Sequence, residues 1–260
     1  MEMKQISLLH LIYSRRTIRK FKKSTISENI LKMIIEAGQR APCYFQTYSI
    51  IWVRDHEKIR EIAEACEDEL TKSMLLNSAA ILLLCIDFNR FRAMLDSLGH
   101  NHIMKLDKYP IESVYAVFEA GLVAENICLA AESLGYGTAL VSHALLSFQT
   151  VASLFNFPNG VVPLIFICIG ERGENPPPRP RWPMQVVFHK DMYNPVTRED
   201  IENYLEAANR AYSTESYLRK YANWHGDYRE YLIERTEVSK DVKKLYDVLS
   251  AFLKKNGLRI

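Results

Sequence analysis

The sequence lacks the short motifs that identify several common kinds of binding site. No G-x-G-x-x-G follows an expected strand and no G-x-x-x-x-G-K-[ST] occurs, which argues against a dedicated Rossmann or P-loop nucleotide site. No H-E-x-x-H occurs either. Of the seven histidines only His100 and His102 are close together, so no metal site is expected.

The cysteines include no C-x-x-C pair, and their number is odd. Scattered cysteines in mostly apolar surroundings indicate reduced thiols, which are typical of a cytoplasmic protein. The longest uninterrupted hydrophobic run is AAILLLCI at 79–86, so no membrane-spanning segment is expected. The cysteines are Cys43, Cys66, Cys85, Cys128 and Cys168.

Neither sign of charge dominates the chain. A formal net charge of +2 provides no global field that would favour nucleic acid or a membrane as the main partner. The 260 residues are 48% hydrophobic and 25% charged, which is typical of a globular protein with ample core. We therefore expect one large domain with an appended tail.

Hydrophobic patterns predict helices interleaved with strands. Helical spacing is found at 5–13, after the expected N-cap Ser27, at 110–134 and at 147–156. Apolar runs long enough for buried strands lie at 48–55, 79–87 and 161–170, and GTALVS follows at 137–142. Helices alternating with roughly four strands indicate an α+β fold.

Three other stretches have a different character. Residues 170–183 include five prolines and two glycines, so an extended loop is expected. Residues 90–112 are expected to form loops that line a pocket. Beyond residue 197 the chain is strongly charged with helical spacing, which predicts a helical tail.

The segment YSRRTIRKFKK (13–23) has six basic residues and no acidic one. Three interpretations are open: a solvated loop, a phosphate site, or a contact with a nucleic-acid backbone. In an extended chain Arg15, Thr17 and Arg19 would share one face, which favours the phosphate site. No RNP-like or helix-turn-helix signal supports nucleic-acid binding.

A second basic pair, Arg179 and Arg181, lies within the proline-rich loop, where proline limits the entropy lost when two guanidiniums converge. A hydrolase dyad of Cys43 and His143 can also be imagined. One such pair is expected by chance among five cysteines and seven histidines.

Four segments in order resemble the nitroreductase superfamily, in particular its NADPH nitroreductase and flavin reductase branch. SRRTIRKF (14–21) is similar to the R-x-S-x-R-x-F opening, and RAPCYFQTYSII (40–51) to the A-P-S-x-x-N-x-Q segment. The helix with LGYGTALV (115–141) and RPRWP (179–183), which is similar to K-P-R-L-P, complete the match. The 41–46 segment is two residues shorter than usual and lacks the family's Asn.

The resemblance implies an α+β, nitroreductase-like fold: a mixed, mostly antiparallel sheet of four to five strands wrapped by helices, with a helical C-terminal extension. It implies a homodimer that binds FMN at its interface and exchanges chain ends, and VVFHKDMY (186–193) is a candidate for an exchanged strand. The implied domains are an FMN-binding domain at 1–196 and an extension at 197–260 packed on the dimer.

The resemblance also assigns residues to the flavin phosphate. Arg15, Arg179 and Arg181 would hold it, Thr17 would bond near the ribityl chain or the phosphate, and Arg16 would serve either part. 

Other residues would contact the flavin ring. Arg19 would lie near flavin N1 and O2, where negative charge collects on reduction. Cys43 and Gln46 would reach the flavin from the partner subunit, and Lys72 would be another polar contact. The segment Leu140, Val141, Ser142 and His143 would lie beside the ring and supply a backbone N–H to N5.

The implied activity is hydride transfer from NADPH or NADH through flavin N5 to a nitroaromatic, quinone or flavin acceptor, by ping-pong kinetics. No catalytic side chain is obligatory, although His143 is placed to tune or protonate the acceptor. The alternative is a non-enzymatic flavin-binding or redox-sensing protein whose tail covers the acceptor site.

Overall fold

The computed structural model describes residues 7–66, 68–106, 110–214 and 216–258. The chain forms two compact units. The first comprises residues 1–176 and 245–260, and the second residues 177–244.

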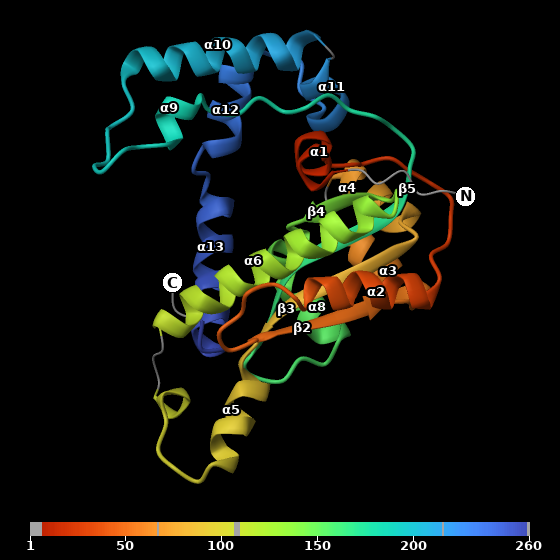
Figure 1. Ribbon diagram of the computed structural model, residues 1–260, viewed down its shortest axis with the longest axis vertical. Helices are drawn as coiled ribbons and strands as arrows, with labels where there is room; N and C mark the ends of the chain where they lie inside the picture. Colours follow the sequence, from red (N-terminus) through yellow and green to blue (C-terminus); the bar gives the residue numbers. More distant parts are fainter. Residues whose placement is uncertain (1–6, 67, 107–109, 215, 259–260) are drawn as a thin grey trace. The chain divides into compact units, whose positions relative to one another are not determined.

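The first unit is built on a sheet that, among the described residues, has five strands in the order β1-β5-β3-β2, with β4 also paired to β5 (Figure 1). Every strand pair is antiparallel, and an isolated bridge between Thr17 and Thr138 is parallel. The strands are β1 (Phe21–Lys22), β2 (Tyr48–Val53), β3 (Ala80–Asp87), β4 (Gly137–Val141) and β5 (Val161–Arg172).

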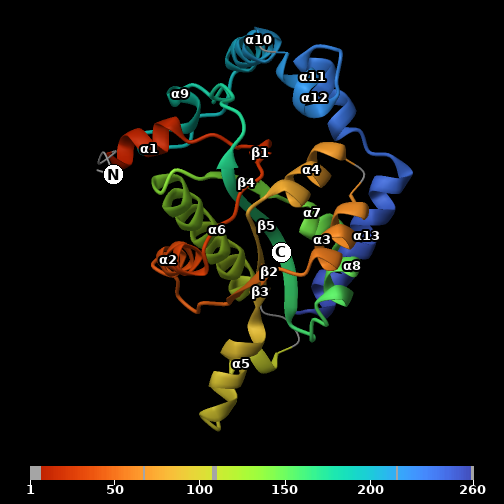
Figure 2. The ribbon, with the colours of Figure 1, turned by 90° about the vertical axis from the view of Figure 1, so that its right-hand side faces the viewer.

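Helices cover both faces of this sheet (Figure 2). Side chains of β3 alternate between two cores: Leu82 and Leu84 pack with α2 and α6, whereas Leu83 and Cys85 face the opposite layer. The first layer is α2 (Glu28–Gly38) and α6 (Pro110–Ser133); the second is α3 (His56–Glu64), α4 (Glu69–Asn77), α7 (His143–Leu146) and α8 (Phe148–Leu154).

The predicted helix after Ser27 is confirmed as α2, whose first turn is capped by the Ser27 hydroxyl accepting from the Ile30 N–H. The predicted buried helix is confirmed as α6. Among the described residues, α6 is the one helix that is long and apolar enough to cross a membrane, with a mean hydropathy of 1.5 over 18 residues. Within the protein 44% of that 18-residue window is buried, and the core helix of a globular protein can have the same length and hydropathy.

The prediction that residues 90–112 form loops is wrong at both ends of that range. There α5 (Phe88–Ser97) begins at an Asp87 cap, a 3-10 helix, η1 (Ile103–Lys105), follows, and α6 begins at Pro110. Phe88 and Phe91 pack with Met104 and with Phe252 of α13 (Lys240–Lys255). Among the described residues the first helix is α1 (Leu8–Ser14).

The second unit consists of the proline-rich loop and helices. Within it, Trp182 stacks on Tyr204 with ring centroids 4.0 Å apart, and tyrosines dominate the core. VVFHKDMY, the candidate exchanged strand, instead ends α9 and continues as irregular chain. The helices of the second unit are α9 (Met184–Val187), α10 (Arg198–Thr214), α11 (Tyr217–Ala222) and α12 (Tyr228–Thr236), followed by the start of α13.

The predicted division at 196/197 stays a prediction, because it concerned flavin binding and packing on a dimer. The two compact units divide the chain at other residues: the second unit begins at Pro177, and residues 245–260 belong to the first.

Candidate functional site

The basic segment is fixed along β4 by its backbone. The Ile18 N–H donates to the Thr138 carbonyl at 2.9 Å, and Glu174 accepts from the N–H groups of Arg19 and Lys20 at 2.7 and 3.2 Å. Ile18 itself is fully buried. The backbone of residues 17–20 is therefore ordered structure and not a free loop.

Two glycines make room for this segment. Gly137 and Gly170 are register partners in β4 and β5. A Cβ at Gly137 would lie 2.7 Å from Cγ1 of Ile18, and one at Gly170 would lie 2.9 Å from Cδ1 of Phe21. Because neither glycine has a side chain, a groove remains over the two strands, and Ile18 and Phe21 fill it.

Alternation along the strands decides which side chains face α6. Ala139 and Val141 belong to the opposite core, so Thr138 and Leu140 point to the α6 face. The parallel bridge puts Thr17 on the same face as Thr138, and with it Arg15. Leu140 is 42% exposed, so apolar surface lies uncovered on this face.

Arg15 lies between two carboxylates of α6. Its guanidinium is 3.5 Å from Glu125 and 4.0 Å from Glu132. Arg16 turns back and donates to the carbonyls of Tyr13 and Arg15, at 2.9 Å each. The Arg19 guanidinium is 3.5 Å from the Thr17 carbonyl.

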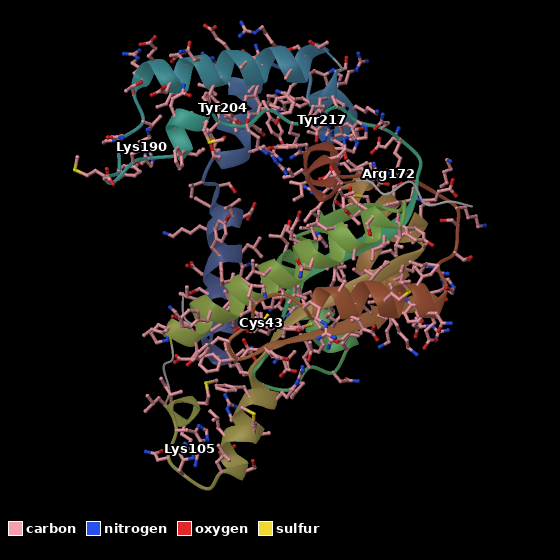
Figure 3. The ribbon with its side chains drawn as sticks, in the orientation of Figure 1. Cys43, Lys105, Arg172, Lys190, Tyr204 and Tyr217 are labelled. Carbon is pink, nitrogen blue, oxygen red and sulfur yellow. The ribbon has the colours of Figure 1, made fainter. Side chains whose placement is uncertain are left out.

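Glu132 is buried at the centre of a polar network. It accepts from the Thr138 hydroxyl at 2.6 Å and from Arg172 at 3.0 Å (Arg172 is labelled in Figure 3). Burial raises the pKa of the Glu132 carboxyl, although the bond from Thr138 and the charges of Arg172 and Arg15 act in the opposite direction. The network ties the basic segment, β4 and β5 to one helix.

A second buried glutamate of α6, Glu119, holds the segment with Cys43 and Gln46. Its carboxylate accepts the backbone N–H groups of Tyr44, Phe45 and Thr47. Gln46 is exposed and left-handed, with φ of 52°, and Cys43, which is labelled in Figure 3, is half-buried.

Sequence reasoning missed Glu119 and Glu132. The available signal was the presence of glutamates in a helix predicted to be apolar on nearly every face, because a buried carboxylate needs partners. Of the four glutamates, Glu112, Glu119 and Glu132 are buried and Glu125 is exposed.

The end of β4 leads into α7. Ser142 precedes the helix, and the His143 Nε2 lies 3.1 Å from the Ala65 carbonyl and 2.5 Å from the Ser147 hydroxyl. The ring is thus held by protein contacts. Lys72 lies on α4, where its ammonium is 2.6 Å from Glu69, and this bond raises the pKa of Lys72.

Arg179 and Arg181 lie in the second unit. Arg179 donates through Nε to the Tyr217 hydroxyl at 2.5 Å, and its guanidinium is 5.0 Å from the centroid of that ring. Arg181 donates to the Pro180 carbonyl at 3.3 Å. That they meet the basic segment on one phosphate stays a prediction.

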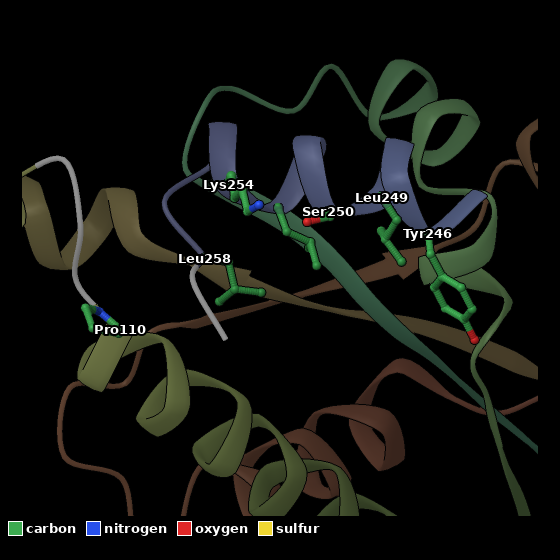
Figure 4. A pocket seen from close by; sticks show the side chains of 7 residues that line it. Pro110, Tyr246, Leu249, Ser250, Lys254 and Leu258 are labelled. Atoms are coloured by element: carbon green, nitrogen blue, oxygen red, sulfur yellow. The ribbon is translucent and has the colours of Figure 1, made fainter. Parts of the chain in front are cut away.

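A cavity of about 540 Å³ lies elsewhere in the first unit, between α13 and the start of α6 (Figure 4). Leu249, Leu253 and Leu258 line it together with Pro110 and Lys254, and none of the predicted site residues does. Among the residues that the structure describes, no three His, Cys, Asp or Glu side chains gather as metal ligands.

Comparison with known proteins gives one family. The model of the nitroreductase family matches residues 12–171. An NADPH-flavin oxidoreductase of Vibrio harveyi is 29% identical over 215 residues, 82% of this chain and 85% of that protein. A Cr(VI) reductase of Pseudomonas sp. (strain G-1) is 28% identical, over 86% of this chain and 91% of its own.

A solved structure shares the fold. An NADPH:FMN oxidoreductase from Vibrio harveyi, complexed with NAD+, superposes with a TM-score of 0.78 at 25% identity, covering 96% of this chain and 97% of that one. The predicted α+β fold with a mostly antiparallel sheet is confirmed by this likeness and by the strand pairing.

Proposed function

This chain belongs to the nitroreductase family, and from that membership we propose that it is an FMN-dependent NAD(P)H oxidoreductase. When bound, FMN would supply the redox chemistry, accepting and donating hydride at N5. The electron donor is NADPH or NADH, and the acceptor is a nitroaromatic, a quinone or a free flavin. Donor and acceptor use the same space in turn, which is a ping-pong mechanism.

The observation that supports this proposal is the shared face of the basic segment and β4. Guanidinium and hydroxyl groups of Arg15 and Thr17 suit phosphate oxygens, and the exposed Leu140 provides apolar surface for a planar ring. The chemistry of this donor set fits a flavin mononucleotide, which is a phosphate joined to an aromatic ring system.

The arginines divide the work. Arg15, Arg179 and Arg181 anchor the phosphate, and Arg16 assists there or at the ribityl chain with Thr17. Because Glu125 and Glu132 flank Arg15, its guanidinium is oriented before any ligand binds.

The remaining site residues act at the ring. Arg19 places a fixed cation where negative charge develops, which favours reduction. The segment Leu140, Val141, Ser142 and His143 supplies a backbone N–H toward N5, and His143 is not obligatory. Cys43 and Gln46 contact the ring from the partner subunit, and Lys72 is a further polar contact.

A homodimer is part of the proposal. Large hydrophobic side chains are exposed on α6, namely Ile111, Val114 and Phe118, and on α1, namely Leu8 and Leu9. Exposed apolar surface of this extent is typical of an interface between subunits. The segment at 197–260 would pack on that dimer.

A cytoplasmic location is also proposed. All five cysteines are free, and four of them are buried in the first unit, as suits a protein kept in a reducing compartment.

The test is the visible absorption spectrum of the purified protein, followed by anaerobic titration with NADPH and, separately, NADH. A flavin spectrum that bleaches with either nicotinamide and returns on addition of a quinone is expected. A protein that binds no FMN would overturn the proposal. Flavin that neither nicotinamide bleaches would favour the alternative, a non-enzymatic flavin-binding or redox-sensing protein.

A further inference from the structure

Glu119 is a buried carboxylate with an unusual set of partners. It is 2% exposed and accepts from the backbone N–H of Phe45 at 2.7 Å and of Thr47 at 3.2 Å. The Tyr44 N–H and, at 3.4 Å, the Thr47 hydroxyl complete the set. Among the residues that the structure describes, no Lys or Arg forms an ion pair with it.

These contacts dictate the shape of the segment at 44–47. Successive N–H groups that converge on one anion form a nest, and such a nest needs a left-handed residue in the backbone. Gln46, with φ of 52°, is that residue. A non-glycine residue in this conformation persists only where its surroundings determine it, and here the carboxylate supplies three bonds around it.

The same carboxylate affects the neighbouring thiol. Burial raises the pKa of Cys43, and the negative charge of Glu119 raises it further. Tyr48 also faces Cys43, and burial raises the pKa of its hydroxyl. Since the other four cysteines are buried, Cys43 is a natural reporter on this segment.

We propose that Glu119 is a positioning residue: its charge holds residues 44–47 in the one conformation that presents Cys43 and Gln46 to the flavin. The part that concerns flavin rests on the proposed function. The part that concerns the segment does not, because every contact named here lies within this chain.

The decisive variant is Glu119→Gln in the full-length protein. The amide keeps the size of the side chain, but its NH₂ group would meet a backbone N–H or the Thr47 hydroxyl and cannot bind the whole nest. Glu36→Gln is the matched control, because Glu36 is an exposed glutamate on α2.

Two measurements separate the claims. The first is the rate of Cys43 alkylation by iodoacetamide in protein freed of flavin, measured from pH 7 to 10, with Cys43→Ser to identify the site. The second is the FMN dissociation constant by fluorescence titration. For Glu119→Gln we expect the alkylation profile to move to lower pH and FMN binding to weaken at least tenfold, while Glu36→Gln matches wild type in both.

An unchanged alkylation profile in Glu119→Gln would show that the carboxylate does not control the segment and would overturn the proposal. A shifted profile with unchanged FMN affinity would overturn its link to the flavin. If wild type binds no FMN, the proposed function fails, whereas alkylation still decides the role of Glu119.

Should Glu119→Gln not fold, Glu119→Asp replaces it. The shorter side chain keeps the charge but cannot reach all three N–H groups. The charge beside Cys43 stays, but the segment loses part of its anchor, so Cys43 should be alkylated faster than in wild type at every pH and FMN binding should weaken. A wild-type alkylation rate in this variant would contradict the proposal.

Discussion

Glu119 and Glu132 lie on the same helix and both are buried, but their partners differ in charge. Glu119 is surrounded by neutral N–H and O–H donors, all from the segment at 44–47. Glu132 meets the guanidiniums of Arg15 and Arg172, which are distant in the sequence, and the hydroxyl of Thr138, six residues away. One carboxylate therefore shapes a single short segment, whereas the other balances charge where several segments meet.

The largest expected effect concerns Arg172, a charged partner of Glu132. Arg172→Met removes the guanidinium 3.0 Å from Glu132 and keeps most of the apolar stem. The substitution leaves the buried Glu132 carboxylate with less positive charge beside it, so we expect a loss of about 2–3 kcal/mol in the free energy of unfolding. This is less than the loss of about 3–5 kcal/mol that is usual for breaking a buried ion pair, because one-third of the Arg172 side chain is exposed to solvent. Urea denaturation measures this.

The loss should depend on pH. The folded-state pKa of Glu132 is raised above its ordinary value of 4.5, so the folded protein holds this proton to higher pH than the unfolded chain does. Stability from this group is thus present at low pH and lost as pH rises past about 4.5. The deficit of Arg172→Met should be larger at pH 7 than at pH 5. Lys22→Met is the control, because Lys22 and Glu171 form an exposed ion pair. It should change the free energy of unfolding by about 0.5 kcal/mol or less at either pH.

A second pair of variants tests the roles proposed for Arg15 and Arg19 in flavin binding and reduction. Arg15→Ala should weaken FMN binding at least tenfold, about 1.4 kcal/mol, because it removes a phosphate ligand. Arg19→Ala should instead lower the midpoint potential by about 30 mV, a tenfold change for a two-electron couple. Fluorescence titration and spectroelectrochemistry measure the two effects. The reverse pattern would show that the two arginines have exchanged roles.

A third pair of variants compares the hydroxyl partners of the two glutamates. Thr138→Val removes a buried hydroxyl that donates at 2.6 Å to Glu132, for an expected loss of about 1.5 kcal/mol in unfolding free energy. The Thr47 hydroxyl lies 3.4 Å from Glu119, so Thr47→Val should cost only about 0.5 kcal/mol. Equal losses would mean that Glu119 depends on its hydroxyl partner as much as Glu132 does.

Long apolar patterns predicted the central elements well. The strands at 48–55, 79–87 and 161–170 and the helix at 110–134 are β2, β3, β5 and α6, with boundaries within a few residues. A strand buried on both faces requires an apolar run, and so does a helix buried on most of its surface. Such runs can be recognised in the sequence without knowledge of the tertiary structure.

Short helices were missed for an identifiable reason. Helices α3, α4 and α5 each follow an aspartate whose carboxylate accepts first-turn N–H groups: Asp55, Asp68 and Asp87. The sequence patterns place Asp55 and Asp87 at the ends of predicted strands, but in the structure each also caps the helix that follows. Helices of nine or ten residues depend on such caps and on packing, so their periodicity alone is weak.

Part of the site was predictable and part was not. The alternation in SRRTIR predicts that Arg15, Thr17 and Arg19 share one face. In the structure Arg15 lies beside two glutamates of α6, and Thr17 bridges to Thr138, which faces α6. The partners of buried carboxylates come from residues 72–75 positions away for Glu119, and such pairings depend on the fold and not on local pattern. The flavin-binding roles themselves stay predictions.

The glycine groove has a consequence for how this sequence can diverge. A methyl group at residue 137 would need the space that Ile18 fills, and one at residue 170 would need the space of Phe21. A smaller side chain at residue 18 would still place its Cβ 2.9 Å from a Cβ at residue 137, and the backbone nitrogen of Ala79 lies 3.2 Å from a Cβ at residue 170, so a smaller facing residue relieves only part of either clash. We therefore expect both glycines to persist among descendants of this gene, which an alignment of such descendants would test.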